Sequence, residues 1–296
     1  MKKENIGVTL ALTYAALDGA FPVILNKNGA TIPPILFAGL TILLGSSVAF
    51  IYAAVTRTLH TLRDKRGWFP MAMVALCVSV LPMLLLFIGT RETSGTNTSF
   101  LLLSELIFTL LFTPFFGEKN DLYKVIGVIG ILIGAAFLLF NDGVKINNGD
   151  ILIILSTITY PVGNFYVKKA FNYIAPGAVL FIRFLLAGLF LCILSLCIEP
   201  FHISSIYNNF GHIILFGLIF MGATKIVWYE GFKYLDISKS ISLLMTFPLF
   251  SLVIILFIGE ETISIYQWIG IIVMMIGVYF SIKRKSVNPA LTKYAT

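Results

Sequence analysis

Long apolar runs, separated by short polar connections, follow one another along nearly the whole chain. Ten such runs fall near residues 6–25, 34–55, 69–89, 99–116, 122–140, 150–167, 176–198, 211–232, 241–258 and 264–282. A transmembrane helix needs about 20 apolar residues, and no run shows the alternation of apolar and polar positions that a barrel strand requires. The pattern predicts an all-α, polytopic membrane protein with about ten transmembrane helices.

The composition supports this interpretation. The chain is 58% hydrophobic and 12% charged, whereas a soluble domain carries roughly 25% charged residues. Too few charged residues remain to coat a water-facing surface, so we expect lipid to contact much of the exterior. The connections leave no room for a separate globular domain, and the first apolar run is expected to be a retained helix rather than a cleaved signal peptide.

Lysine and arginine are concentrated in alternate loops. Of the 21 such residues, 16 fall in one set of alternate loops and termini, and three fall in the other set. Cytoplasmic loops carry the excess of positive charge, so we expect both termini on the cytoplasmic side of the inner membrane. The net charge of +7 follows from this topology, and no nucleic-acid partner is implied.

The chain also matches itself after a shift of 142 residues. The matched pairs include Gly7 and Gly149, Pro34 and Pro176, Gly89 and Gly231, Phe108 and Phe250, and Gly117–Glu118 and Gly259–Glu260. The shift divides the chain into a first repeat (1–143), a second repeat (144–286) and a cytoplasmic tail (287–296).

Each repeat contains five spans, which is an odd number, so the second copy must enter the membrane from the opposite side. Two inverted five-helix repeats can rock about a site near the bilayer midplane and expose it to each side in turn. Inverted repeats also occur in channels, which remain an alternative at this point. The arrangement favours a transporter.

Several motifs resemble the EamA-type transporters of the drug/metabolite transporter superfamily. They are residues 16–27 (ALDGAFPVILNK), residues 176–188 (PGAVLFIRFLLAG), and the Gly-Glu pairs at 117–118 and 259–260. The resemblance covers nearly the whole chain. It implies a ten-helix transporter of amino acids, nucleotide sugars or other metabolites, with helices 1, 3, 4, 6, 8 and 9 around a central cavity. Two positions depart from the family pattern: Asp18 stands where Trp is frequent, and Thr41 stands where an arginine is expected.

Two carboxylic acids, Asp18 and Glu105, lie well inside apolar runs and near the expected bilayer centre. A charge at the bilayer centre costs about 2.5 to 3.5 kcal/mol, so such residues are the best functional candidates. At 1.5 Å per residue, Asp18 lies about 18 Å from the cytoplasmic side and Glu105 about 21 Å, in a core of about 30 Å. If both face one cavity, burial and mutual repulsion would favour a proton on one of them. We therefore expect a proton-coupling site; the alternative is that either acid is paired structurally.

Other polar residues are expected around the same site. Lys225, followed closely by Trp228 and Tyr229, could neutralise Asp18 or bind a carboxylate of the substrate. Tyr160 and Asn164 occupy the repeat positions of Asp18 and Pro22, and they could form the opposite wall, although a buried Asn can also hydrogen-bond a neighbouring helix.

A second group of residues is expected to have structural or gating roles. Arg183 lies close to the start of its helix, from where its side chain could extend to the membrane surface. Four prolines interrupt helices that the family resemblance places around the cavity, and such kinks free backbone carbonyls. These prolines are Pro22, Pro82, Pro161 and Pro248.

The sequence shows no nucleotide-binding loop and no histidines or cysteines at metal-ligand spacing, so we expect no enzyme activity, cofactor or metal. The expected partners are a small-molecule substrate and the lipid bilayer, with monomer and homodimer both open. The leading hypothesis is a secondary transporter of small polar metabolites such as amino acids, with proton coupling or exchange. The alternatives are a multidrug efflux pump, which would need a cavity without a fixed cation, and a membrane scaffold.

Overall fold

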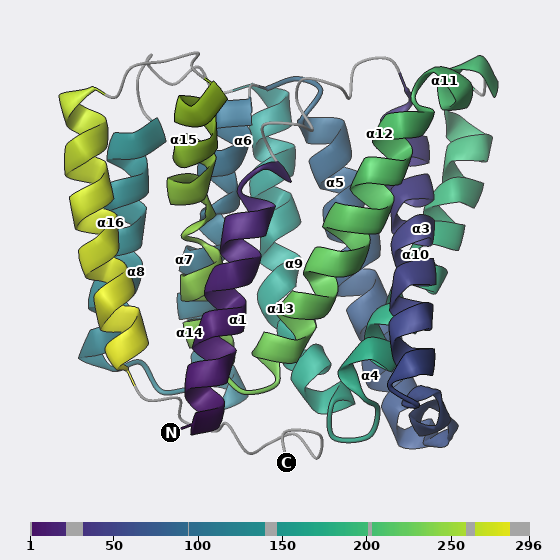
Figure 1. The fold of residues 1–296 in the computed structure, drawn as a ribbon, viewed down its shortest axis with the longest axis horizontal. Helices are drawn as coiled ribbons and strands as arrows, with labels where there is room; N and C mark the ends of the chain where they lie inside the picture. Colours follow the sequence, from purple (N-terminus) through teal and green to yellow (C-terminus); the bar gives the residue numbers. More distant parts are fainter. Residues whose placement is uncertain are drawn as a thin grey trace.

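A computed structural model describes residues 2–21, 32–93, 95–139, 147–200, 203–258 and 264–284. All regular structure within these residues is helical. Figure 1 shows the helices side by side, most of them running between two opposite ends of the molecule. The start of α1 and the end of α16 lie at the same end, the lower one in Figure 1. We call this end the N-terminal face.

In the first half, the helices are α1 (Lys2–Asp18), α3 (Pro34–Val55), α4 (Trp68–Val74), α5 (Leu81–Gly89), α6 (Gly95–Leu102), α7 (Ser104–Phe112) and α8 (Leu122–Leu139). In the second half, they are α9 (Asn148–Ala170), α10 (Pro176–Ile198), α11 (Ile203–Asn208), α12 (Phe210–Ile214), α13 (Thr224–Phe232), α14 (Ile237–Leu244), α15 (Phe247–Ile258) and α16 (Ile265–Lys283).

Each of the ten apolar runs contains helix, and the expected fold class is confirmed. Within the described residues, six helices are long and apolar enough to cross a membrane, and three further apolar helices are shorter. The expected boundary between residues 143 and 144 and the tail 287–296 lie outside the described residues, so the domain division stays a prediction.

The repeat is visible in how four of the spans are interrupted. A π-helical segment, Ala75–Val80, joins α4 to α5, and its counterpart Leu215–Ala223 joins α12 to α13. Leu103 separates α6 from α7, and its repeat partner Met245 lies in the break between α14 and α15. Hydropathy does not distinguish a π-helix from an α-helix, so the sequence predicted the spans but not these interruptions.

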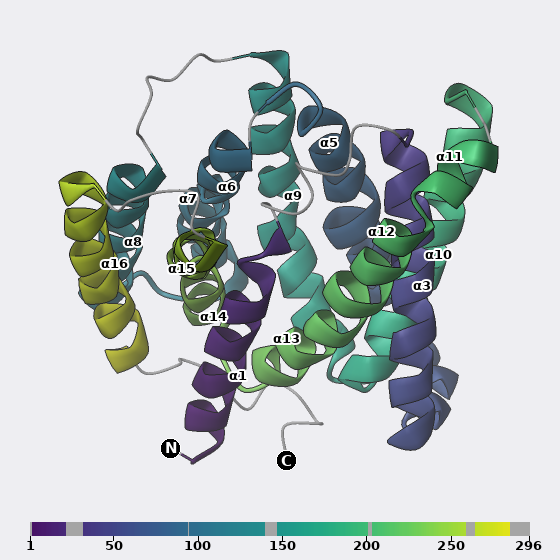
Figure 2. The ribbon, with the colours of Figure 1, turned by 45° about the horizontal axis from the view of Figure 1, so that its top comes forward.

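Two close helix pairs flank the centre of the bundle. Figures 1 and 2 place α8 beside α16 on one side, and α3 beside α10 on the other. The first pair is close because small residues face each other: a Cβ on Gly130 would lie 2.8 Å from the Cα of Gly277. In lipid, helix association depends on such close packing. The interrupted helices lie between the two pairs.

Candidate functional site

A cavity of about 100 Å³ lies between the two repeats. Residues from α1, from the spans that contain the two π-helical segments, from α6 and α7, from α9, and from α14 and α15 line it. These are the six spans that the family resemblance placed around a central cavity. A seventh helix, α10, also contributes, through Arg183. The polar lining residues are Tyr14, Asp18, Glu105, Tyr160, Asn164, Arg183 and Lys225.

Asp18 and Lys225 form an ion pair across the repeats. The Lys225 Nζ lies 3.3 Å from Asp18 Oδ1. The Tyr14 hydroxyl donates a hydrogen bond of 3.0 Å to Asp18 Oδ2 and accepts one from Lys225. The Trp228 ring packs against Tyr14 with centroids 5.2 Å apart. Of the two roles expected for Lys225, this geometry corresponds to neutralising Asp18.

Glu105 has a different environment. Its side chain is buried, with 4% of its surface exposed, and Asn164 Nδ2 donates a hydrogen bond of 3.4 Å to its Oε1. Glu105 forms no ion pair with another described residue. The break at Leu103 places Glu105 in the first turn of α7, where the helix dipole favours a negative charge. Ser104 anchors this turn to α9 through a hydrogen bond of 2.7 Å with Thr157.

Arg183 lies at the cavity and not at the membrane surface. Only 3% of its surface is exposed, and its guanidinium donates to the Tyr229 hydroxyl. The guanidinium carbon lies 4.6 Å from the ring centre of Phe184 and 5.1 Å from that of Tyr229. The side chain therefore does not extend to the surface as expected, because cation–π contacts and the tyrosine hydroxyl hold it inside.

The remaining predicted residues are placed as follows. Tyr160, Asn164 and Trp228 line the cavity, whereas Tyr229 does not line it and contacts Arg183. Pro82 is the second residue of α5, just after a π-helical segment, Pro161 lies within α9, and Pro248 is the second residue of α15. Pro22 lies outside the described residues.

The sequence did not single out Tyr14, although its spacing of four residues from Asp18 puts both on one helix face.

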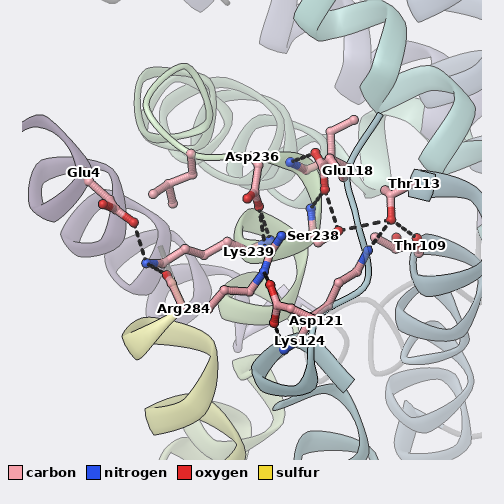
Figure 3. Close-up of polar contacts among 12 residues, drawn as sticks. Glu4, Thr109, Thr113, Glu118, Asp121, Lys124, Asp236, Ser238, Lys239 and Arg284 are labelled. Carbon is pink, nitrogen blue, oxygen red and sulfur yellow. Dashed lines mark hydrogen bonds and ion pairs between the residues drawn. The ribbon is translucent and has the colours of Figure 1, made fainter. Parts of the chain in front are cut away.

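A second group of polar residues closes the N-terminal face (Figure 3). Lys239, on α14, has a side chain that is 2% exposed and donates to Glu4 on α1 at 2.7 Å. It also donates to the backbone carbonyls of Ile282 and Arg284 at 2.7 and 2.6 Å. The Arg284 guanidinium in turn bonds Asp121 at 2.9 Å and Asp236 at 3.0 Å. The network ties α1, α8, α14 and α16 together.

Glu118 is bonded to the start of α14 in the same network. Its carboxylate accepts from the backbone nitrogens of Ile237 at 2.6 Å and Ser238 at 3.0 Å, and from the Ser238 hydroxyl at 2.6 Å. Burial, and then the nearby Asp236 charge, raise the pKa of Glu118, while these donors oppose the shift. Burial also opposes ionisation of Asp121, but the Lys124 amide and Arg284 outweigh it and lower the pKa of Asp121.

A similar cap connects the repeats at the opposite end. Glu199, which follows α10, accepts hydrogen bonds of 2.9 Å from the backbone nitrogens of Ile35 and Leu36 at the start of α3. Ser195 donates to the same carboxylate at 2.6 Å. Each repeat thus supplies a carboxylate that caps a helix of the other repeat.

Comparisons with known proteins assign both halves of the chain to one transporter family. A model of the EamA-like transporter family matches residues 5–140 and again residues 147–283. The chain is 23% identical to "Uncharacterized transporter YoaV" of Bacillus subtilis (strain 168), over 95% of this chain and 100% of that protein. It is 24% identical to "Uncharacterized transporter in trpA 3'region" of Buchnera aphidicola subsp. Schlechtendalia chinensis, over 95% of this chain and 94% of that protein.

A solved crystal structure has the same fold. The alignment covers 93% of this chain and 96% of that chain, with a TM-score of 0.76 and 17% sequence identity. At this identity the likeness concerns the fold alone.

Proposed function

We propose that this chain, which belongs to the EamA-like transporter family, is a secondary transporter. It moves small polar metabolites, such as amino acids, by alternating access. The observation that carries the proposal is the cavity between the two repeats, which is lined by two acidic and two basic side chains. A cavity at the interface of inverted repeats can face either side of the membrane when the repeats rock.

Glu105 is the residue we assign to proton coupling. It is a buried carboxyl group whose described hydrogen-bond partner is the neutral amide of Asn164, and it forms no ion pair with another described residue. Asp18, by contrast, already has Lys225 as a partner at 3.3 Å. Release of a proton from Glu105 into an opened cavity would couple proton movement to the change of conformation.

The network on the N-terminal face supplies the closed gate. Lys239, Arg284 and Glu118 connect the two repeats there, through Glu4, Asp121 and the start of α14 respectively, and these contacts must break before the cavity opens to that side. We assign this face to the cytoplasm, because the loop of residues 57–66 on it is basic, and the corresponding loop 199–209 contains no lysine or arginine.

The alternatives fit less well. A multidrug pump would need an acidic, aromatic cavity without a fixed cation, but both Arg183 and Lys225 line this one. Two relatives carry names that describe them as transporters, which favours transport over catalysis or a scaffold role.

Reconstitution into proteoliposomes tests the proposal. Uptake of a panel of labelled metabolites, amino acids included, is measured with and without an imposed pH gradient. We expect the gradient to drive accumulation in the wild type. Glu105→Gln should abolish this accumulation while retaining exchange of internal for external substrate, because a permanently neutral side chain cannot carry the proton. Glu92→Gln, the same substitution at an exposed loop position, is the matched control.

The mechanism is wrong if no compound moves and if neither Asp18→Asn nor Glu105→Gln changes transport or ligand-induced thermal stability. Gradient-driven accumulation that persists in Glu105→Gln would remove the proton-coupling assignment and leave transport itself standing.

A further inference from the structure

Arg183 is a buried cation whose hydrogen-bonding capacity and charge are only partly satisfied by the residues around it. Its Nε is buried and has no hydrogen-bond partner among the described residues. Its side chain also forms no ion pair with a carboxylate in that part of the chain. Buried charges are normally paired, because removing an unpaired charge from water is costly. A guanidinium stays protonated in proteins, so it cannot reduce this cost by losing its proton.

The other cation of the cavity is already neutralised. Lys225 has Asp18 at 3.3 Å and also donates to Tyr14. Of the two cations that line the cavity, Arg183 is therefore the one whose charge is left without a carboxylate partner among the described residues.

The surroundings of Arg183 suit it to hold an anion. The rings of Phe184 and Tyr229 lie against the guanidinium, and the Tyr229 hydroxyl accepts from one of its terminal nitrogens. These contacts fix the plane of the group without neutralising it. A guanidinium held in this way presents its donors in the fork that matches the two oxygens of a carboxylate.

We propose that Arg183 is the anion-binding residue of the cavity, and that the transported molecules are small carboxylates whose carboxylate group pairs with this guanidinium. This assignment rests on the proposed transport function and names its substrate class. The rest of the cavity wall is largely apolar, with Met83, Leu86, Leu244 and Met245 among the lining residues. These side chains would contact an apolar tail of the molecule.

Two kinds of molecule share this chemistry: a simple monocarboxylate, and an amino acid whose ammonium group would face Glu105. They differ only in the ammonium group, so an experiment can separate them while it tests the shared carboxylate.

Ligand-induced thermal stability of the purified full-length chain in detergent is the first measurement. The probes are L-alanine and L-leucine, their amides, and the corresponding acids without the amino group, propanoate and 4-methylpentanoate. We expect carboxylate probes to raise the melting temperature of the wild type, and the two amides to leave it unchanged. Stabilisation by the amino acids alone would identify zwitterions; stabilisation by both carboxylate sets would identify carboxylates in general.

Two substitutions locate the effect. Arg183→Gln should weaken carboxylate binding by at least about 30-fold, because it removes one partner of a buried charge pair. Arg183→Lys keeps the positive charge and loses the fork, so it should keep the preference for carboxylates over amides with affinity reduced by about 10-fold or more. It also provides the readout if Arg183→Gln does not fold. The matched control, Arg63→Gln at the exposed end of a short 3-10 helix, should bind like the wild type.

The assignment is overturned if amides stabilise the wild type as well as carboxylates do, if no carboxylate probe stabilises it, or if both Arg183 variants bind carboxylates with unchanged affinity. A transport assay in proteoliposomes distinguishes failure of the Arg183 assignment from failure of the proposed transport function. Carboxylates that bind through Arg183 but never cross proteoliposome membranes would refute transport and leave the binding site standing. Metabolite transport that neither Arg183 variant changes would support transport and refute the Arg183 binding site.

Discussion

The residues around the cavity show how strongly the partners of a charge determine its role. Asp18 and Lys225 neutralise each other, while Glu105 and Arg183 have neutral hydrogen-bond partners. Asp18, Glu105 and Lys225 could be identified from sequence, because a charged residue inside an apolar run is rare. The buried position of Arg183 could not be predicted, because its distance from the helix start does not reveal the aromatic rings that hold the side chain inside; its expected structural or gating role stays a prediction.

A double-mutant cycle tests the Asp18–Lys225 pair. Asp18→Asn and Lys225→Met should each lower the free energy of unfolding by about 2 kcal/mol or more, because each leaves a largely buried charge without its partner. The double variant should lose less than the sum of the two single losses. The measurement is chemical unfolding in mixed micelles. Additive losses would mean that the two charges do not stabilise each other.

At the scale of helices, the interruptions of four spans position the site. The break at Leu103 places Glu105 in a first turn, and the π-helical segment Leu215–Ala223 lies directly before the helix that carries Lys225. The ten spans were predictable because apolar runs of about this length match the thickness of the bilayer core. The interruptions were not, because they depend on contacts between helices that hydropathy does not encode. The two carboxylate caps also join segments more than 100 residues apart.

The caps give a matched pair of predictions. Glu118→Ala should speed hydrogen exchange of the Ile237 and Ser238 amides about 5-fold or more, and Glu199→Ala should do the same for the Ile35 and Leu36 amides. The reason is that loss of a helix cap costs about 1 kcal/mol. Each variant is the control for the other, because the caps lie at opposite ends of the bundle. Equal acceleration of both sites in either variant would indicate global loosening.

Acid should weaken the N-terminal face through Asp121. Its pKa is lowered in the folded protein, because the Lys124 amide and Arg284 outweigh the effect of burial. The stability that Asp121 contributes is therefore complete above its unfolded pKa, about 4, and is lost as the pH falls through the folded value. The difference in melting temperature between wild type and Asp121→Asn should shrink as the pH drops below about 4. A constant difference would contradict this reasoning.

At the scale of the whole molecule, the two repeats should present equivalent loops on opposite sides of the membrane. Residue 65 in the first repeat corresponds to residue 207 in the second, and both side chains are exposed. Figure 1 places α11, which contains Tyr207, at the end opposite the N-terminal face. The count of spans and their inversion could be predicted from the 142-residue repeat, because an odd number of spans per copy requires inversion.

Cysteine labelling tests this topology and the assigned orientation. In a chain whose three native cysteines are replaced by serine, Tyr207→Cys should react with a membrane-impermeant maleimide in intact cells. Lys65→Cys should react only after the cells are permeabilised. The opposite pattern would reverse the orientation, and reaction of both in intact cells would refute the inversion.

The cap on α3 has a consequence for how the protein is made. The carboxylate that satisfies Ile35 lies 164 residues further along the chain. At about 5 to 20 residues per second, the ribosome reaches that residue on the order of ten seconds after it has made α3. During this interval the first turn of α3 must find water or lipid headgroups for its free N–H groups. The first repeat can therefore enter the membrane early, but this helix end acquires its native partner only after Glu199 has been synthesised.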